Sequence, residues 1–269
     1  MNTRRIDDVF FLGDALLLVE DERTRAVVTE CWSRDAAARR IVVRPVGGRI
    51  GVEGLVRASR EQGRKHVFGL VDRDFGDAGA QGPVFHTGWH EFENHLLDFD
   101  GLAALHERES ATALTARAET RARELVAWMA VRRTLHETKT ALPATPPDPR
   151  HDEGVDLTAA QRWFDARPYP EDIEREIHRT WTRHYLKETC LPKHLGDCEN
   201  ELNNGSWIET FSGKELFEHL ASRGGWRHGR SAPDEVATLL ARRWARGVLP
   251  GCMAFLSGVR DAIVRACRL

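Results

Sequence analysis

The first hundred residues alternate between short apolar runs and segments with helical periodicity. The apolar runs are residues 14–20 (DALLLVE), 41–46 (IVVRPV), 66–71 (HVFGLV) and 83–86 (PVFH). Between the first three, residues 22–32 and 52–63 repeat apolar positions at helical spacing. Strands that alternate with helices are typical of a parallel sheet with right-handed crossovers. The pattern therefore predicts an α/β fold in which helices flank a parallel sheet.

After about residue 100 the strand pattern ends. Residues 102–142 are rich in Ala, Leu, Arg and Glu, which predicts one long helix or two shorter ones. Four prolines between residues 143 and 149 cannot continue a helix and predict a connector. Capping residues and an initial proline predict four later helix starts, at Thr158, Pro170, Ser212 and Ser231. We therefore expect the rest of the chain to be mostly helical.

Acidic residues follow two of the predicted strands. Glu20 ends the first, and Asp72 and Asp74 follow the third. Functional groups of open parallel sheets collect at these strand ends, and strand alternation would turn both aspartates to the same side. Clustered carboxylates repel one another unless protons or a cation compensate, and hard oxygen ligands suit Mg²⁺ or Mn²⁺. The three acids predict a divalent-metal site; the alternative interpretation is that the aspartates cap turns and the glutamate is an exposed strand end.

Three segments together resemble a known family. LLLVE and VDRD, separated by a strand that ends in Gly-Gly, resemble the TOPRIM domain of topoisomerases, primases and OLD-family nucleases. HEFENHLL resembles the E-N-x-L-L segment of stand-alone OLD-like TOPRIM proteins, long classed as a domain of unknown function and found beside ATPases in anti-phage defence. FSGKELF, residues 211–217, resembles their Gly-Lys segment. The resemblance implies a TOPRIM-like, Rossmann-like domain over residues 1–100 and a helical region, 101–269, that adds the Gly-Lys segment to the site.

The resemblance also implies catalytic roles. Glu20 would be a metal ligand or general base, and Asp72 and Asp74 would hold Mg²⁺ or Mn²⁺. Lys214 would neutralise charge on the phosphoryl oxygens; without the resemblance, a solvated surface lysine is the simpler interpretation. Two ions about 4 Å apart can activate a water and stabilise the leaving oxygen of a phosphodiester. The implied function is a metal-dependent nuclease that cleaves DNA or RNA as an effector of anti-phage defence.

The sequence offers fewer acidic residues for a second metal ion. The resemblance implies that Glu93, with Glu91 beside it, would complete this position. OLD-like proteins usually carry another acid four residues after the first glutamate, and here that position is Thr24. Asp21 and Glu22 are nearby, but neither shares the expected helical face. The sequence therefore leaves open whether one metal ion or two would bind.

This departure keeps a rival function open. The chain could be a catalytically degenerate TOPRIM module that binds nucleic acid or regulates an ATPase complex. It contains no G-x-x-x-x-G-K-[ST] motif, so any ATPase would be a separately encoded subunit. Topoisomerase chemistry needs a tyrosine nucleophile, and Tyr169 and Tyr185 both lie outside the matched segments.

Other potential sites are weaker. His90 and His95 are five residues apart, so a helix would not bring them to one face as a zinc hydrolase requires; we expect His90 to face substrate or support a metal ligand, with a surface role as the alternative. A zinc site at His184, Cys190, His194 and Cys198 lacks a C-x-x-C knuckle. The tryptophans of the helical half have spacing typical of a core, although they could stack on bases. Five basic residues could track a phosphate backbone or form a solvated face: Arg49, Arg57, Arg60, Arg64 and Lys65.

Composition adds little to this picture. The formal net charge of −2 does not indicate a polycation, and five cysteines predict reduced thiols rather than a disulfide framework. No apolar run is long enough to cross a bilayer, and the N-terminus has no secretory pattern, so we expect a cytoplasmic protein. The sequence does not distinguish DNA from RNA as the substrate. It also leaves open the sequence specificity, the activating signal and the formation of a homo-oligomer.

Overall fold

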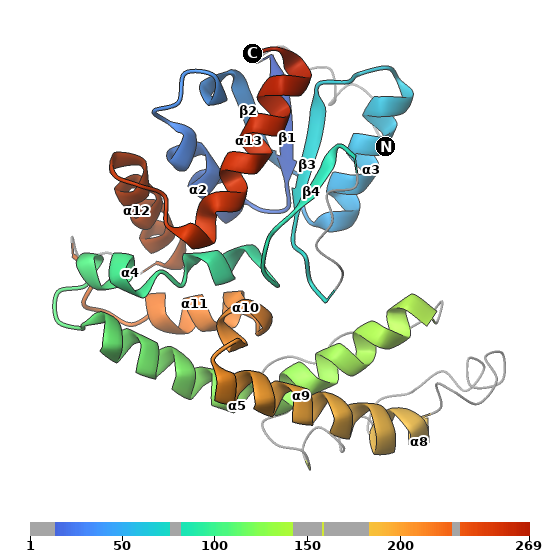
Figure 1. Cartoon of the computed structure of the whole chain (residues 1–269), viewed down its shortest axis with the longest axis vertical. Helices are drawn as coiled ribbons and strands as arrows, with labels where there is room; N and C mark the ends of the chain where they lie inside the picture. Colours follow the sequence, from blue (N-terminus) through green and yellow to red (C-terminus); the bar gives the residue numbers. More distant parts are fainter. Residues whose placement is uncertain (1–13, 76–81, 142–157, 159–182, 228–231) are drawn as a thin grey trace.

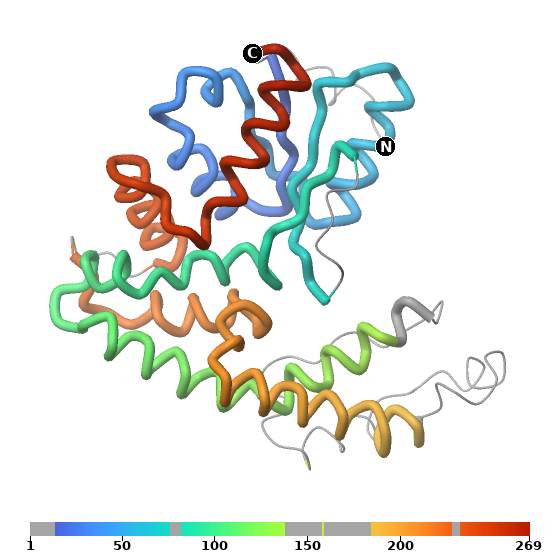
Figure 2. Tube along the Cα trace, viewed as in Figure 1, coloured from blue at the N-terminus to red at the C-terminus, as the bar shows by residue number. Residues whose placement is uncertain are grey.

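The computed structural model describes residues 14–75, 82–141, 158, 183–227 and 232–269, and the remaining residues are drawn in grey in Figure 2. A four-stranded sheet forms the centre of the N-terminal half. All its strands are parallel and lie in the order β2-β1-β3-β4. Their bounds are Ala15–Val19 (β1), Ile41–Pro45 (β2), Val67–Val71 (β3) and Val84–His86 (β4). The predicted parallel α/β sheet is confirmed.

Helices cover both faces of this sheet (Figure 1). They are α2 (Glu22–Trp32), α3 (Arg49–Glu61) and α13 (Ala254–Cys267). Leu16 and Leu18 of β1 pack with Val52 of α3 on one face. Leu17 and Val19 point to the other face and join the cluster that contains buried residues of α2 and α13. This alternation along β1 gives the sheet two buried faces, which explains why the strand is apolar throughout.

The C-terminal region is helical, as predicted. Two short 3₁₀ helices, η1 (Ala38–Arg40) and η2 (Phe92–Leu96), still belong to the first hundred residues, and the C-terminal region begins with α4 (Phe99–Leu105) and α5 (Ala111–Ala141). A continuous helical stretch follows, formed by α8 (Arg183–Tyr185), the π-helical η3 (Leu186–Cys190) and α9 (Leu191–Asn204). The last elements are α10 (Trp207–Thr210), α11 (Gly213–Ala221), α12 (Pro233–Arg246) and η4 (Gly251–Met253) before α13. The helices α5 and α9 lie side by side below the sheet in Figure 1.

The observed helix bounds agree with one of the predicted helix starts and divide one predicted helix. The predicted helix over residues 102–142 is divided into α4 and the longer α5. Ser212 caps α11 as predicted, because its side chain accepts a hydrogen bond from the backbone N–H of Glu215. The connector at 143–149 and the starts at Pro170 and Ser231 lie outside the described residues, and Thr158 is described only as an isolated position.

The apolar core runs across the predicted domain boundary near residue 100. Buried residues of the strands and of α4, α5, α9, α11, α12 and α13 belong to one continuous cluster. Trp207, Trp226 and Trp244 are part of it, so the core interpretation of these tryptophans is confirmed, whereas Trp163 and Trp181 lie outside the described residues.

In the part of the chain that the structure describes, no single helix is long and apolar enough to cross a membrane. Only the bent helix pair Pro233–Arg246 and Gly251–Cys267 reaches that length and apolar composition when its two helices are taken together.

All five cysteines are free, as predicted, and we expect three of them to be nearly unreactive in the folded protein. Burial raises the pKa of the Cys31 and Cys198 thiols to about 12 and that of Cys252 to about 11. Because the thiolate is the nucleophile, iodoacetamide at pH 8 should alkylate each at least about 100-fold more slowly than in urea-unfolded protein. Mass spectrometry of timed labelling measures these rates. Alkylation of any of the three at the unfolded rate would contradict the expectation.

Candidate functional site

Glu20 and Asp72 meet at the carboxyl edge of the sheet. They directly follow β1 and β3, which are parallel neighbours. The backbone N–H of Asp72 donates a 2.7 Å hydrogen bond to Oε1 of Glu20. The Gly-Gly turn after β2 adds two contacts, because the N–H groups of Gly47 and Gly48 both donate to the carbonyl of Glu20 at 3.0 Å. Both glycines have positive φ, 86° and 98°, which favours glycine at these positions. The turn therefore fixes the backbone that carries Glu20.

Asp72 lies in an excess of negative charge. Its Oδ1 accepts a 2.7 Å hydrogen bond from the backbone N–H of Phe92. Burial of the carboxylate raises the pKa of Asp72 well above its ordinary value, and the charges of Glu20, Glu93, Glu91 and Asp74 raise it further. Burial also raises the pKa of Glu20. Within the described residues, neither Glu20 nor Asp72 has an ion pair. Either a proton or a bound cation would relieve this repulsion.

Asp74 is close to Asp72, but the predicted reason was wrong. The strand β3 ends at Val71, so strand alternation does not extend to either aspartate. Asp74 instead adopts a left-handed conformation with φ of 51°, and its N–H donates a 2.7 Å hydrogen bond to the carbonyl of His90. Its Oδ2 lies 3.5 Å from a guanidinium nitrogen of Arg49, the first residue of α3. The turn after β3 thus brings Asp74 beside the N-terminus of α3.

Glu93 is held by an arginine that sequence analysis missed. Its Oε1 accepts a 2.8 Å hydrogen bond from Arg23 of α2. Burial raises the pKa of Glu93 to about 7, helped by the charge of Glu91 and opposed by Arg23. Arg23 also pairs with Glu218 of α11 at 3.0 Å and with Asp234 of α12 at 2.6 Å. The guanidinium of Arg23 therefore joins α2 to η2, α11 and α12. A single arginine early in a helix gives no sequence signal for this role.

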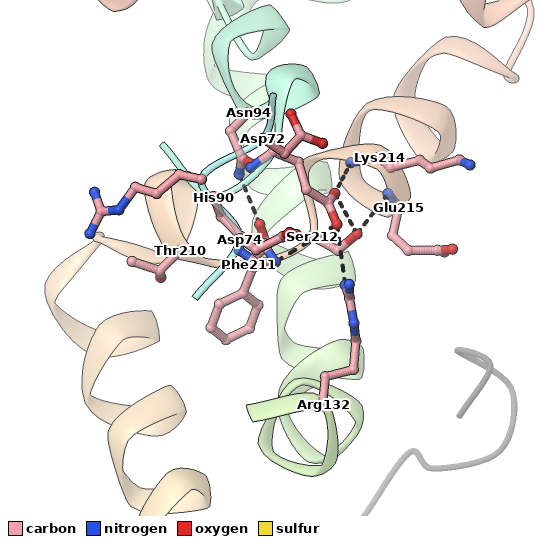
Figure 3. A network of polar contacts seen from close by, with 12 residues as sticks. Asp72, Asp74, His90, Asn94, Arg132, Thr210, Phe211, Ser212, Lys214 and Glu215 are labelled. Atoms are coloured by element: carbon pink, nitrogen blue, oxygen red, sulfur yellow. Dashed lines mark hydrogen bonds and ion pairs between the residues drawn. The ribbon is translucent and has the colours of Figure 1, made fainter. Parts of the chain in front are cut away.

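Glu91 connects the sheet edge to the helical half through Arg132, Ser212 and Lys214, which Figure 3 labels. Its Oε2 accepts 2.9 Å hydrogen bonds from the hydroxyl of Ser212 and from the backbone N–H of Lys214. Its Oε1 lies 3.2 Å from a guanidinium nitrogen of Arg132, which reaches up from α5. Burial alone would raise the pKa of Glu91, but His90, Arg132 and the donors of α11 hold it below its ordinary value. Protein donors occupy both oxygens of this predicted metal ligand.

The Gly-Lys segment contacts the site through its backbone. The side chain of Lys214 is exposed and extends away from the Glu91 network in Figure 3. Its predicted contact with phosphoryl oxygens stays a prediction. Gly213 instead lies so close to Asn94 that a Cβ atom at this position would be 2.2 Å from the backbone nitrogen of Asn94. The Gly-Lys segment therefore packs its Gly213 backbone directly against Asn94 of η2.

Asn94, whose role sequence analysis missed although its motif was noticed, is fully buried and satisfied. Its Oδ1 accepts a 2.7 Å hydrogen bond from the N–H of Glu91. Its amide nitrogen donates to the carbonyl of Ile208 at 2.7 Å and to that of Phe211 at 2.9 Å. The asparagine of the E-N-x-L-L segment thus joins η2 to α10 and its C-cap, Phe211.

The other expected residues surround this network or lie outside it. Thr24 is buried, and Asp21 is the N-cap of α2 whose carboxylate accepts from the Thr24 N–H at 2.8 Å. Glu22 pairs with Arg25 on the helix surface. His90 is only 3 % exposed, so the alternative of a surface role is wrong. Cys190, His194 and Cys198 are buried.

Across the described ranges, no three Asp, Glu, His or Cys side chains form a group that could hold a metal ion. The donor chemistry nevertheless suits a hard divalent cation, since Glu20 and Asp72 offer carboxylate oxygens without an ion pair. Comparisons with known proteins add no further constraint: no protein-family model, curated protein or solved structure matches this chain.

Proposed function

We propose that this protein is a divalent-metal-dependent nuclease with a TOPRIM-like catalytic edge. The observation that carries the proposal is the pairing of Glu20 and Asp72 at adjacent strand ends. Burial and then the charges of Glu20 and three further acids raise the pKa of Asp72, and within the described residues neither carboxylate of the pair has an ion pair. Glu20 and Asp72 would hold Mg²⁺ or Mn²⁺, with Asp74 beside them. The bound ion would activate water and stabilise charge on a phosphodiester.

The N-terminus of α3 would place positive charge beside Glu20, where a substrate phosphate would bind. The Gly47-Gly48 turn fixes Glu20 and leads directly into α3, whose first N–H, that of Arg49, donates to the Glu20 carboxylate. Backbone N–H groups at a helix N-terminus favour anions, and the Arg49 guanidinium adds positive charge there. Arg49 would therefore orient the substrate phosphate while Glu53, at 2.7 Å, and Asp74, at 3.5 Å, hold its side chain.

The test is metal-dependent cleavage of labelled plasmid, single-stranded DNA and a tRNA mixture. Asp72→Asn and Glu20→Gln should each lower the rate by more than about 100-fold, the upper range for residues that only support metal ligands. Asp100→Asn, an exposed aspartate of α4, is the matched control and should leave the rate unchanged. Cleavage that survives both site changes would overturn the proposal.

A second measurement separates a metal ligand from a structural aspartate. Without metal, Asp72→Asn should unfold at the wild-type temperature or above it, because Asn can still accept from Phe92 while removing repulsion from neighbouring acids. Wild type should gain thermal stability with Mn²⁺, by ligand linkage, and the variant should not. A variant that unfolds several degrees lower without metal would assign Asp72 a structural role instead.

The rival function is a nucleic-acid-binding or regulatory subunit beside a separately encoded ATPase. It is favoured by the engagement of Glu91 and Glu93 with Arg132 and Arg23, together with Thr24 at the position of an expected acid. These contacts leave fewer free carboxylates than two metal ions need. Nucleic-acid binding without cleavage under any metal condition would favour this alternative.

A further inference from the structure

A cavity of about 560 Å³ lies next to the acidic edge, by which we mean the carboxyl edge of the sheet with Glu20, Asp72 and Asp74. It has no role in the chemistry proposed above. Its walls come from the turn after β3, the helices α5 and α9, and the end of α10. Asp74 belongs both to its lining and to the acidic edge. The volume is within the range of about 300–1,000 Å³ that is typical of small-molecule sites. A group bound here would therefore be adjacent to a phosphate bound at Glu20 and Asp72.

One wall of the cavity is built from flat rings. The ring of Phe75 lies 4.4 Å from that of His90 and 5.2 Å from that of His136, measured between centroids. The guanidinium of Arg133 lies 5.8 Å from the Phe75 ring. Aromatic and guanidinium planes are the surfaces on which proteins stack unpaired bases. This wall suits a planar ring better than an extended chain.

His90 adds an unmet hydrogen-bonding requirement. It lines the cavity and is 3 % exposed, and among the described residues neither ring nitrogen has a hydrogen bond within 3.5 Å, the Asp74 backbone being a more distant polar neighbour. Nε2 only faces the Glu91 carboxylate at 3.7 Å. Buried polar atoms of native proteins are nearly always satisfied, so an imidazole without a short hydrogen bond at a cavity wall suits a polar partner bound beside it. A neutral imidazole offers one donor and one acceptor, as the edge of a nucleobase does.

The charge of the lining favours an uncharged occupant over a polyphosphate. Two arginines line the cavity, and Arg73 donates to the carbonyl of Gly88 at 3.1 Å. Arg133 is engaged by Glu201 through bonds of 2.9 and 2.6 Å. Five carboxylates line the cavity, namely those of Asp74, Glu137, Asp197, Glu201 and Glu209. They would repel phosphate oxygens but not an uncharged ring. Asn200, on an exposed part of α9, supplies a further donor and acceptor for such a ring.

We propose that the cavity binds one unpaired nucleobase of the substrate strand, next to the phosphate that the acidic edge would hold. This inference rests on the proposed nuclease function and adds a requirement to it: the substrate must present a base outside the double helix. A nucleobase could also arrive as a free nucleotide. The position of Asp74 between cavity and edge favours the substrate strand.

The test measures binding in EDTA, so that it does not depend on cleavage. Fluorescence anisotropy compares hairpins, in DNA and RNA versions, that contain a one-nucleotide bulge, the same bulge without its base, or full pairing. Loss of the bulged base should weaken binding by wild type about 5- to 150-fold, the range for losing one base stack. Equal affinity for all three hairpins would overturn the inference.

Variants assign the effect to the cavity. His90→Phe and Asn200→Leu should remove most of the preference for the bulged base, and Asn203→Leu, an exposed residue one turn further along α9, should keep it. Asn200 is exposed, so its variant keeps the test valid even if His90→Phe fails to fold. Full preference in Asn200→Leu and in folded His90→Phe would contradict the assignment.

Two further outcomes separate the sources and the hypotheses. Competition by free AMP or CMP that depends on His90 and Asn200, without any preference for the bulge, would assign the cavity to a free nucleotide and overturn the substrate-strand proposal. Metal-dependent cleavage without a bulged-base preference would leave the nuclease standing and reject the inference. A bulged-base preference without cleavage would reject the nuclease and keep the cavity's role.

Discussion

Gly213→Ala is expected to destabilise the protein by several kcal/mol. The new Cβ atom would lie 2.2 Å from the backbone nitrogen of Asn94 and 2.6 Å from its side-chain Oδ1. Asn94 cannot move aside easily, because its side chain bonds Glu91, Ile208 and Phe211. Overpacking costs about 1–3 kcal/mol, and the separation of α11 from η2 would add the loss of these buried hydrogen bonds. Urea unfolding measures the change.

Gly196→Ala is the matched control for this substitution. Gly196 lies inside α9, and a Cβ atom there would meet no atom within 4 Å. Alanine should therefore stabilise the protein by about 0.4–1 kcal/mol through its better helix propensity and lower unfolded-state entropy. If both alanine variants had the same stability, the close contact at Gly213 would not exist in solution.

Glu91→Ala is expected to cost about 3–5 kcal/mol, the range for breaking a buried ion pair. The substitution leaves the guanidinium of Arg132, the hydroxyl of Ser212 and the N–H of Lys214 without their shared acceptor. Glu91→Gln should cost less, because an amide oxygen can still accept from α11. Chemical unfolding of both variants measures the difference. Glu199→Ala, at an exposed position of α9, is the control and should lie within about 0.5 kcal/mol of wild type.

A double-mutant cycle tests whether the charge pair is the cause. Arg132→Leu combined with Glu91→Ala should cost less than the sum of the two single changes, by about 0.5–3 kcal/mol. The loss of Arg132 stacking on Trp128, whose ring centroid lies 5.0 Å from the guanidinium carbon, occurs in both arms and cancels. Strict additivity would show that the two residues act independently.

Sequence patterns predicted those parts of the site that depend on local structure. Glu20 and Asp72 could be found because strand ends are visible as ends of apolar runs, and parallel neighbours must meet at one edge. The pairing of Asp74 with this edge was predicted for a wrong reason, since its left-handed turn depends on Arg49 and His90 rather than on strand alternation.

The remainder depends on contacts between residues far apart in the chain. Arg132 approaches Glu91 from 41 residues away, and Arg23 reaches Asp234 across 211 residues. Arginines are common in this sequence, and no local pattern separates these two from the solvated ones. The cavity is likewise formed only when α5 and α9 pack below the sheet.

The contacts of Glu91 and Asn94 have a consequence for the order in which the protein is made. Ser212 is 121 residues after Glu91, and Phe211 is 117 residues after Asn94. Chains emerge from the ribosome N-terminus first, and their early segments begin to fold while the rest is still being synthesised. The strands that precede Glu20 and Asp72 therefore emerge long before α11 can pack against η2. The contacts of Glu91 and Asn94 can therefore form only late in translation, so unfinished chains carry Glu20 and Asp72 without the helical half that packs against η2.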